Sequence, residues 1–125
     1  MVVKYLENDG GNVVLSNDSG IKIYNDKYEN LPKPLWITTL FFVHDIEDSK
    51  LASKLLSKVA YCKVKELDLE NQILNLNEFK MVVGSTDSAL TDFEFRNSIV
   101  KSGDGTILST EEILKLLPKL KYFNW

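Results

Sequence analysis

The chain has little of the chemistry on which most enzymes depend. Its 125 residues include one histidine, His44, and one cysteine, Cys62. Metal centres, nucleophilic sites and general-base sites usually draw on several such residues together. A single cysteine cannot form an internal disulfide, so nothing indicates an oxidising compartment. These scarcities favour a non-enzymatic protein, and the sequence predicts no catalytic residue, cofactor or metal site.

Positive charge of the kind that grips nucleic acid is also scarce. The formal net charge is −3 at pH 7, and Arg96 is the single arginine among 15 basic residues. This balance argues against nucleic-acid binding, which relies on basic surfaces and bidentate arginine contacts. No apolar run approaches the ~20 residues that cross a bilayer, and no basic start precedes a hydrophobic stretch. We therefore expect a cytoplasmic protein, away from membranes, whose partner is another protein.

What remains is an ordinary globular composition. Hydrophobic residues make up 44% of the chain and charged residues 26%, which is typical of a folded domain and not of a disordered one. The length suits one domain, and we find no internal repeat or linker in the sequence. A single globular domain over residues 1–125 is predicted.

Alternating and turn-forming residues predict β-structure in the first third. The turn signals Asn8–Gly11 and Asn17–Gly20 separate β-prone segments, as in an antiparallel meander. Residues 36–43 are β-branched, aromatic or leucine throughout, which predicts a central strand. Residues 63–83 are also predicted to be strand, whereas residues 88–100 fit either a helix or a strand.

Two segments predict helices. Apolar residues at helical spacing indicate one long helix from about residue 47 to residue 61. Ser109 and Glu112 form a capping box, which predicts a short C-terminal helix over about 111–117 that ends before Pro118. The predicted fold is therefore α+β: a mostly antiparallel sheet, built from the N-terminal meander and strand 36–43, packed by the long helix and the short one.

Aromatic residues supply the leading functional hypothesis. Trp36 and the tail residues Tyr122, Phe123 and Trp125 could anchor a partner protein, with packing in the core as the alternative. The hypothesis is a non-enzymatic protein-interaction module, such as a small acidic inhibitor, immunity or accessory protein of a bacterium or phage. Open sheet edges and the aromatic tail are also compatible with a homo-oligomer.

A second hypothesis places a ligand at a strand end. Its residues are His44, Asp45, Ser85, Thr86 and Asp87. The loop Gly84–Asp87 could cradle a phosphate or other small ligand, for binding or for an enzyme reaction. His44-Asp45 resembles the dipeptide of HD-type metal phosphohydrolases, which use further histidines that this chain lacks. A third hypothesis is a structural subunit of a virion or larger assembly.

Three smaller patterns remain. Residues 100–111 resemble an EF-hand calcium loop, with Asp104 and Gly105 well placed but Val100 where such loops carry aspartate; a glycine-rich turn before a capped helix explains them equally. Lysines 50, 54 and 58 would form one row on the long helix, as either a binding stripe or a solvated face. Cys62 is predicted to pack in the interior, the alternative being a reactive thiol.

Overall fold

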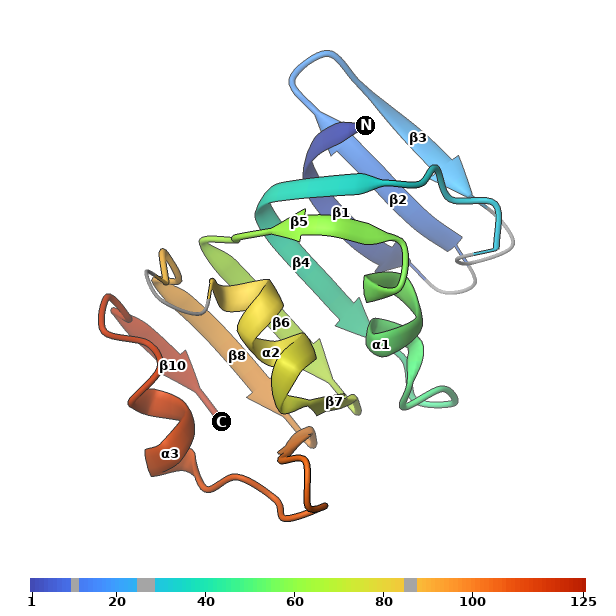
Figure 1. Ribbon diagram of the computed structural model, residues 1–125. Helices are drawn as coiled ribbons and strands as arrows, with labels where there is room; N and C mark the ends of the chain where they lie inside the picture. The colour runs from blue at the N-terminus through green and yellow to red at the C-terminus, as the bar shows by residue number, and fades with distance from the viewer. Residues whose placement is uncertain (10–11, 25–28, 85–87) are drawn as a thin grey trace.

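The computed structural model describes residues 1–9, 12–24, 29–84 and 88–125 (Figure 1). Its helices are α1 (Leu51–Leu56), α2 (Leu76–Val83) and α3 (Thr110–Leu114). Its strands are β1 (Val2–Asp9), β2 (Asn12–Asn17), β3 (Gly20–Tyr24), β4 (Leu35–His44), β5 (Val59–Cys62), β6 (Glu66–Glu70), β7 (Ile73–Asn75), β8 (Asp92–Arg96), β9 (Ile99–Lys101) and β10 (Tyr122–Asn124). Within these described ranges, no helix has both the length and the apolar character needed to span a membrane.

One large sheet organises the chain. Its strand order is β10-β8-β6-β4-β1-β2-β3, and β5 also pairs with β4. The pairs β1–β2 and β2–β3 are antiparallel, which confirms the predicted meander. The other pairs of named strands, including β7–β9 in a separate small sheet, are parallel. Among the described strands, antiparallel pairing is therefore confined to the meander, because crossovers containing α1 and α2 return the chain to the same end of the sheet.

The predicted long helix over residues 47–61 is wrong. Helix α1 covers only its middle, and the chain then enters β5, where Val59 and Tyr61 pair with β4. A helix this short depends on packing more than on propensity, so the β-prone residues after it join the sheet instead. The predicted apolar stripe is confirmed for Leu51 and Leu55, which are fully buried.

The other predicted elements are confirmed in part. Residues 36–43 form the body of β4, at the centre of the sheet. Helix α3 begins with the predicted capping box but ends at Leu114, earlier than expected. The prediction of strand over 63–83 missed α2, whose start is capped reciprocally by Asn75 and Glu78. The ambiguous residues 88–100 contain two strands, β8 and β9.

Strands β4, β6 and β8 are equivalent members of a repeat that the sequence analysis missed. Phe41 pairs with Leu67, and Leu67 pairs with Phe93; each pair is 26 residues apart. The same spacing relates Ile73 of β7 to Ile99 of β9. Each strand is followed by a turn and a short helix, as in a small solenoid. The repeat escaped notice because it keeps the hydrophobic pattern and changes most side chains.

The hydrophobic core lies between the sheet and the helices. Figure 1 shows all three helices on one face of the sheet, with β3 and β10 at its opposite edges. The inward side chains of the repeat strands are fully or almost fully buried: Phe41, Val43, Leu67, Leu69, Phe93 and Phe95. The Phe79 ring of α2 lies 5.9 Å from the Phe93 ring, measured between centroids. The other face of the repeat strands has no described helix on it.

A buried glutamine joins successive repeats. The Gln72 side chain is 1% exposed; its Oε1 accepts a hydrogen bond from the Ala52 N–H at 2.9 Å, and its Nε2 donates to the Asp48 carbonyl at 3.0 Å. Its backbone N–H donates to the Ser98 hydroxyl, and its carbonyl accepts from Ile99. Buried polar groups need hydrogen-bond partners. Gln72 supplies such partners to the preceding repeat and to the following repeat.

Replacing this glutamine tests the connection between repeats. Gln72→Leu should lower the free energy of unfolding by about 2–4 kcal/mol, because buried backbone groups near α1 lose their partners. Urea unfolding followed by tryptophan fluorescence measures the change. Lys119→Leu, at an exposed position, is the control and should change stability by less than about 0.5 kcal/mol. Equal stability of the two variants would contradict this role of Gln72.

Candidate functional site

Side chains of the repeat strands that point away from the helices form a continuous surface, the open face. Register brings them, together with two residues of β10, into three rows across the sheet: His44–Glu70–Arg96; Phe42–Asp68–Glu94–Asn124; and Leu40–Glu66–Asp92–Tyr122. Residues alternate between the two faces of a strand, so the pairs that bury the core also align these rows. The open face therefore carries five carboxylates on two adjacent strands, β6 and β8.

The histidine of the open face lies between two of these carboxylates. His44 Nε2 is 2.5 Å from Asp68 Oδ1, and His44 Nδ1 is 3.2 Å from Glu70 Oε2. The Phe42 ring stacks on the imidazole at a centroid distance of 4.1 Å. These contacts fix the ring orientation, because both nitrogens and one ring face have partners. The imidazole is thereby held on β4 with carboxylates beyond it.

Arg96 of β8 contacts one of these carboxylates, Asp68, and also Glu94 on its own strand. Its Nη2 atom lies 3.9 Å from Asp68 Oδ1 and 3.8 Å from Glu94 Oε2, both long for an ion pair. Within the described part of the chain, its buried Nε atom has no hydrogen-bond partner. Exposed pairs of this length contribute little stability. Arg96 therefore leaves most of the negative charge uncompensated.

Two carboxyl groups in the middle row crowd each other. Adjacent strands lie about 4.8 Å apart, and Asp68 is directly opposite Glu94. A hydrogen bond with Asp68, desolvation and the Asp68 charge together raise the pKa of Glu94 above its ordinary value. Ionising both groups is therefore unfavourable, and a cation placed between them would relieve the repulsion.

A shallow depression of about 160 Å³ lies on the acidic part of the open face. Its walls include Glu66, Asp92 and Glu94, with Leu40 on one side and Tyr122 on the other. The depression thus combines carboxylate oxygens with apolar edges. Such a surface can hold a cationic group that is attached to an aliphatic chain.

The aromatic residues chosen from the sequence do not form one site. Tyr122 lies at the β10 end of the open face and is 50% exposed. Trp36 is 46% exposed, but it lies near the start of β4, where its ring is 5.3 Å from the ring of Tyr61. Two strands, β6 and β8, separate β4 from β10. Trp36 and Tyr122 therefore lie on strands that are not neighbours, and they do not share one site.

The last two aromatics belong to the helix side of the sheet. Phe123 is partly buried with its ring 5.4 Å from Phe93, and Trp125 is 5.0 Å from Phe95. Both follow the inward positions of the neighbouring strand, because Phe123 pairs with Phe93. Core packing accounts for Phe123, while Trp125 remains 48% exposed.

The second hypothesis concerns two residues at the end of β4 and a loop that the structure describes only at Gly84. His44 ends β4, and the Asp45 carboxylate accepts backbone hydrogen bonds within the turn before α1. Ser85, Thr86 and Asp87 lie outside the described residues. Gly84 lies against Lys63, which bonds to Ile37, seven residues before His44 and thus roughly 20 Å away along the strand. The described residues give no geometry that brings this loop to the strand end.

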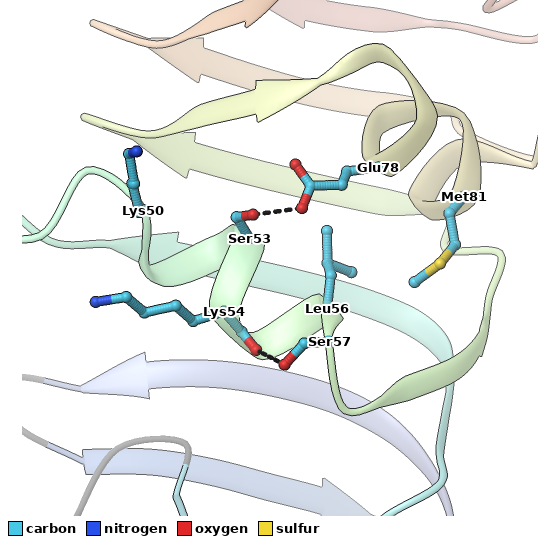
Figure 2. Close-up of a pocket in the computed structure, with 7 residues that line it drawn as sticks. All are labelled: Lys50, Ser53, Lys54, Leu56, Ser57, Glu78 and Met81. Carbon is cyan, nitrogen blue, oxygen red and sulfur yellow. Dashed lines mark hydrogen bonds between the residues drawn. The ribbon is translucent and has the colours of Figure 1, made fainter.

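A larger pocket of about 420 Å³ lies on the helix side, between α1 and α2. Figure 2 shows a hydrogen bond from the Ser53 hydroxyl to Glu78 across it, and the ammonium ends of Lys50 and Lys54 pointing away from Met81. Lys54 pairs with Asp48, at 3.0 Å. The predicted lysine row is not formed, since α1 ends before residue 58.

The remaining sequence patterns have structural explanations. Cys62 is buried as predicted, and desolvation raises the pKa of its thiol to about 12, far from a reactive range. Phe95 and Ile99 lie in strands, so the helix that should precede an EF-hand loop is absent from this described segment. Nowhere in the described ranges do three His, Cys, Asp or Glu residues gather as a possible metal site.

Sequence reasoning missed the acidic surface, although a signal was present. Glu66–Glu70 and Asp92–Arg96 both alternate charged and apolar residues, which is typical of strands with one exposed face. Their alignment needed the 26-residue register, which was not recognised.

No protein-family model matches the chain, and no curated protein or solved structure matches it significantly either.

Removing one charge of the crowded pair should stabilise the fold. The raised pKa of Glu94 means that its ionised form is disfavoured in the folded state, at a cost that appears as pH rises above 4.5. Glu94→Gln should therefore raise Tm at pH 7 by roughly 1–3 °C. Thermal unfolding at pH 7 and pH 3 tests this. The difference should vanish at pH 3, and a lower Tm for the variant at pH 7 would contradict it.

The loop after β9 offers a separate titration. Hydrogen bonds from Ser102 and Thr106 lower the pKa of Asp104 from 3.8 to about 2. The stabilisation that the ionised Asp104 carboxylate gives to this loop is fully present above pH 3.8. It is lost as pH falls through about 2. Ser102→Ala should raise the Asp104 pKa toward 3.8, measured by NMR of the carboxyl carbon. An unchanged pKa in the variant would refute the contribution of the Ser102 hydroxyl.

Proposed function

We propose that the chain is a non-enzymatic protein-interaction module that binds its partner with the open face. The observation that carries the proposal is the row-by-row alignment of exposed side chains on parallel repeat strands. Repeat stacks of this kind present extended surfaces whose side chains stand at regular spacing, and such surfaces suit the binding of other proteins. The helix face is occupied by the core, which leaves the open face for a partner.

Exposed aromatics at the margins support the same assignment. Tyr122 borders the acidic depression. The Trp36–Tyr61 pair lies near the start of β4, at the end of that strand opposite to His44. Tyrosine and tryptophan are enriched among residues that dominate binding energy at interfaces. Trp36 and Tyr122 are two of the four residues that the sequence predicts to bind a partner. We propose further that the module is a small inhibitor, immunity or accessory protein that acts in the cytoplasm.

One observation favours a second candidate, a carboxylate-based enzyme or ligand-binding domain. The short contact between His44 and Asp68 is a geometry that can hold a general base. The same face also carries five carboxylates, the Arg96 guanidinium and the Tyr122 hydroxyl. Soaking the protein with small phosphorylated or carbonyl compounds and observing His44 by NMR would favour this candidate if its ring signals shifted at one site.

Site-specific crosslinking in the cell of origin tests the leading proposal. A photo-crosslinking phenylalanine derivative placed at Tyr122 should capture one discrete protein. The matched control places it at Leu114 of α3, which is 37% exposed on the helix side. The same derivative at Leu114 should capture nothing discrete. Capture from Leu114 and none from Tyr122 would contradict the assignment of the open face.

A further inference from the structure

We propose that the open face binds an extended basic segment of the partner protein, in which lysine or arginine alternates with uncharged residues. The proposal rests on the proposed function and names the chemistry of its partner. Three features carry it: the unbalanced charge on β6 and β8, the spacing of the carboxylates, and the depression between the two strands.

Charge on the open face is strongly one-sided. Five carboxylates face two cationic or titratable groups, Arg96 and His44. Both of these lie in the same row, and their ion-pair contacts are with Asp68, Glu70 and Glu94. No lysine, arginine or histidine of the described segments pairs with Glu66 or Asp92. Within the described residues, the carboxylates in the row that also contains Tyr122 therefore have no cationic side chain paired with them, and a cationic partner gains most there.

Carboxylate spacing matches an extended chain. Glu66, Asp68 and Glu70 occupy alternate positions of β6, which places them about 6.6 Å apart. An extended peptide presents alternate side chains at the same interval. A segment lying along β6 would thus place successive basic side chains over successive carboxylates. Asp92 and Glu94 add a second line about 4.8 Å to one side, so basic groups over Glu66 and Asp68 meet acids from two strands. A basic group over Glu70 would lie beside Arg96 instead.

The depression fits the shape of a basic side chain. Its edges at Leu40 and Tyr122 are apolar, and its acids come from both strands. Lysine and arginine lay aliphatic stems along apolar surface while their charged ends stay at polar groups. The Tyr122 ring can also attract a cation through its face. The volume of the depression, about 160 Å³, can hold one such side chain but is too small for a drug-sized molecule.

A synthetic peptide of seven residues, alternating lysine and threonine from one end to the other, is the probe. Fluorescence anisotropy with the complete chain at low salt should show saturable binding that weakens as salt is added. A glutamate–threonine peptide of the same length should not bind. A peptide with the same four lysines in one block should bind several-fold more weakly, because only alternate residues face the sheet.

Charge-neutralising variants locate the binding site. The triple variant Glu66→Gln, Asp92→Asn and Glu94→Gln should raise Kd for the alternating peptide about ten-fold. The matched control Glu29→Gln, Glu47→Gln and Glu111→Gln removes the same charge at exposed positions off the open face and should change Kd less than about two-fold. Thermal unfolding checks that both variants fold, and Asp92→Asn alone, at an exposed position, should weaken binding in the same direction. Equal weakening by both triples, or no binding by the unaltered chain, would overturn the proposal.

The outcomes separate this inference from the function on which it rests. Crosslinks from Tyr122 together with no binding of the alternating peptide would keep the interaction module and reject the basic partner. Peptide binding that the open-face triple abolishes, together with crosslinks from Leu114 alone, would show an acidic surface that is not the partner's docking site. Agreement of both experiments would support the two proposals together.

Discussion

The structure depends on the lateral pairing of equivalent strands at one fixed register. The 26-residue offset between β4, β6 and β8 brings Phe41, Leu67 and Phe93 into one buried row. Because side chains alternate along a strand, the offset also decides which residues face outward. A shift by one residue would bury the carboxylates and expose the phenylalanines. The core and the open face are therefore two consequences of the same constraint.

Polar groups at the turns hold this register. Asn71 and Asn97 both have positive φ, at 58° and 48°, and they too are 26 residues apart. Asparagine tolerates this conformation better than most residues. The Asn71 side chain donates to the Asp45 carbonyl, and the Asn97 side chain donates to Asn71. With Gln72 beside them, these contacts make a ladder at the ends of the repeat strands, so that each turn depends on its neighbour.

Stability and binding place opposite demands on the open face. Placing Glu94 directly opposite Asp68 disfavours the ionised form of Glu94, as its raised pKa indicates. Burial of the hydrophobic rows and the hydrogen bonds at the turns offset the resulting loss of folding free energy. Surfaces that bind are often less stable than they could be, because selection for function opposes selection for stability. A basic partner would remove the repulsion on binding, which links the electrostatic strain of the free protein to the proposed function.

Local patterns in the sequence were enough to predict single elements. Continuous apolar residues identified β4, turn residues identified the β1–β3 meander, and the Ser109–Glu112 box identified the start of α3. Pairing between distant segments was not predictable in this way. Val59 and Ala60 fit a helical spacing as well as a strand, and pairing with the distant strand β4 decides between the two. Of the predicted partner-binding residues, Tyr122 lies on the open face, whereas Phe123 packs against the core.

Mapping the binding surface by NMR tests the central claim most directly. The account predicts that titration of the alternating lysine–threonine peptide into isotope-labelled protein shifts backbone amide signals of β6 and β8 and the side chains of Tyr122 and His44. Signals of α1 and α2 should stay unchanged, because these helices lie behind the sheet. Shifts confined to α1, α2 or the pocket between them would contradict the assignment of the open face as the docking surface.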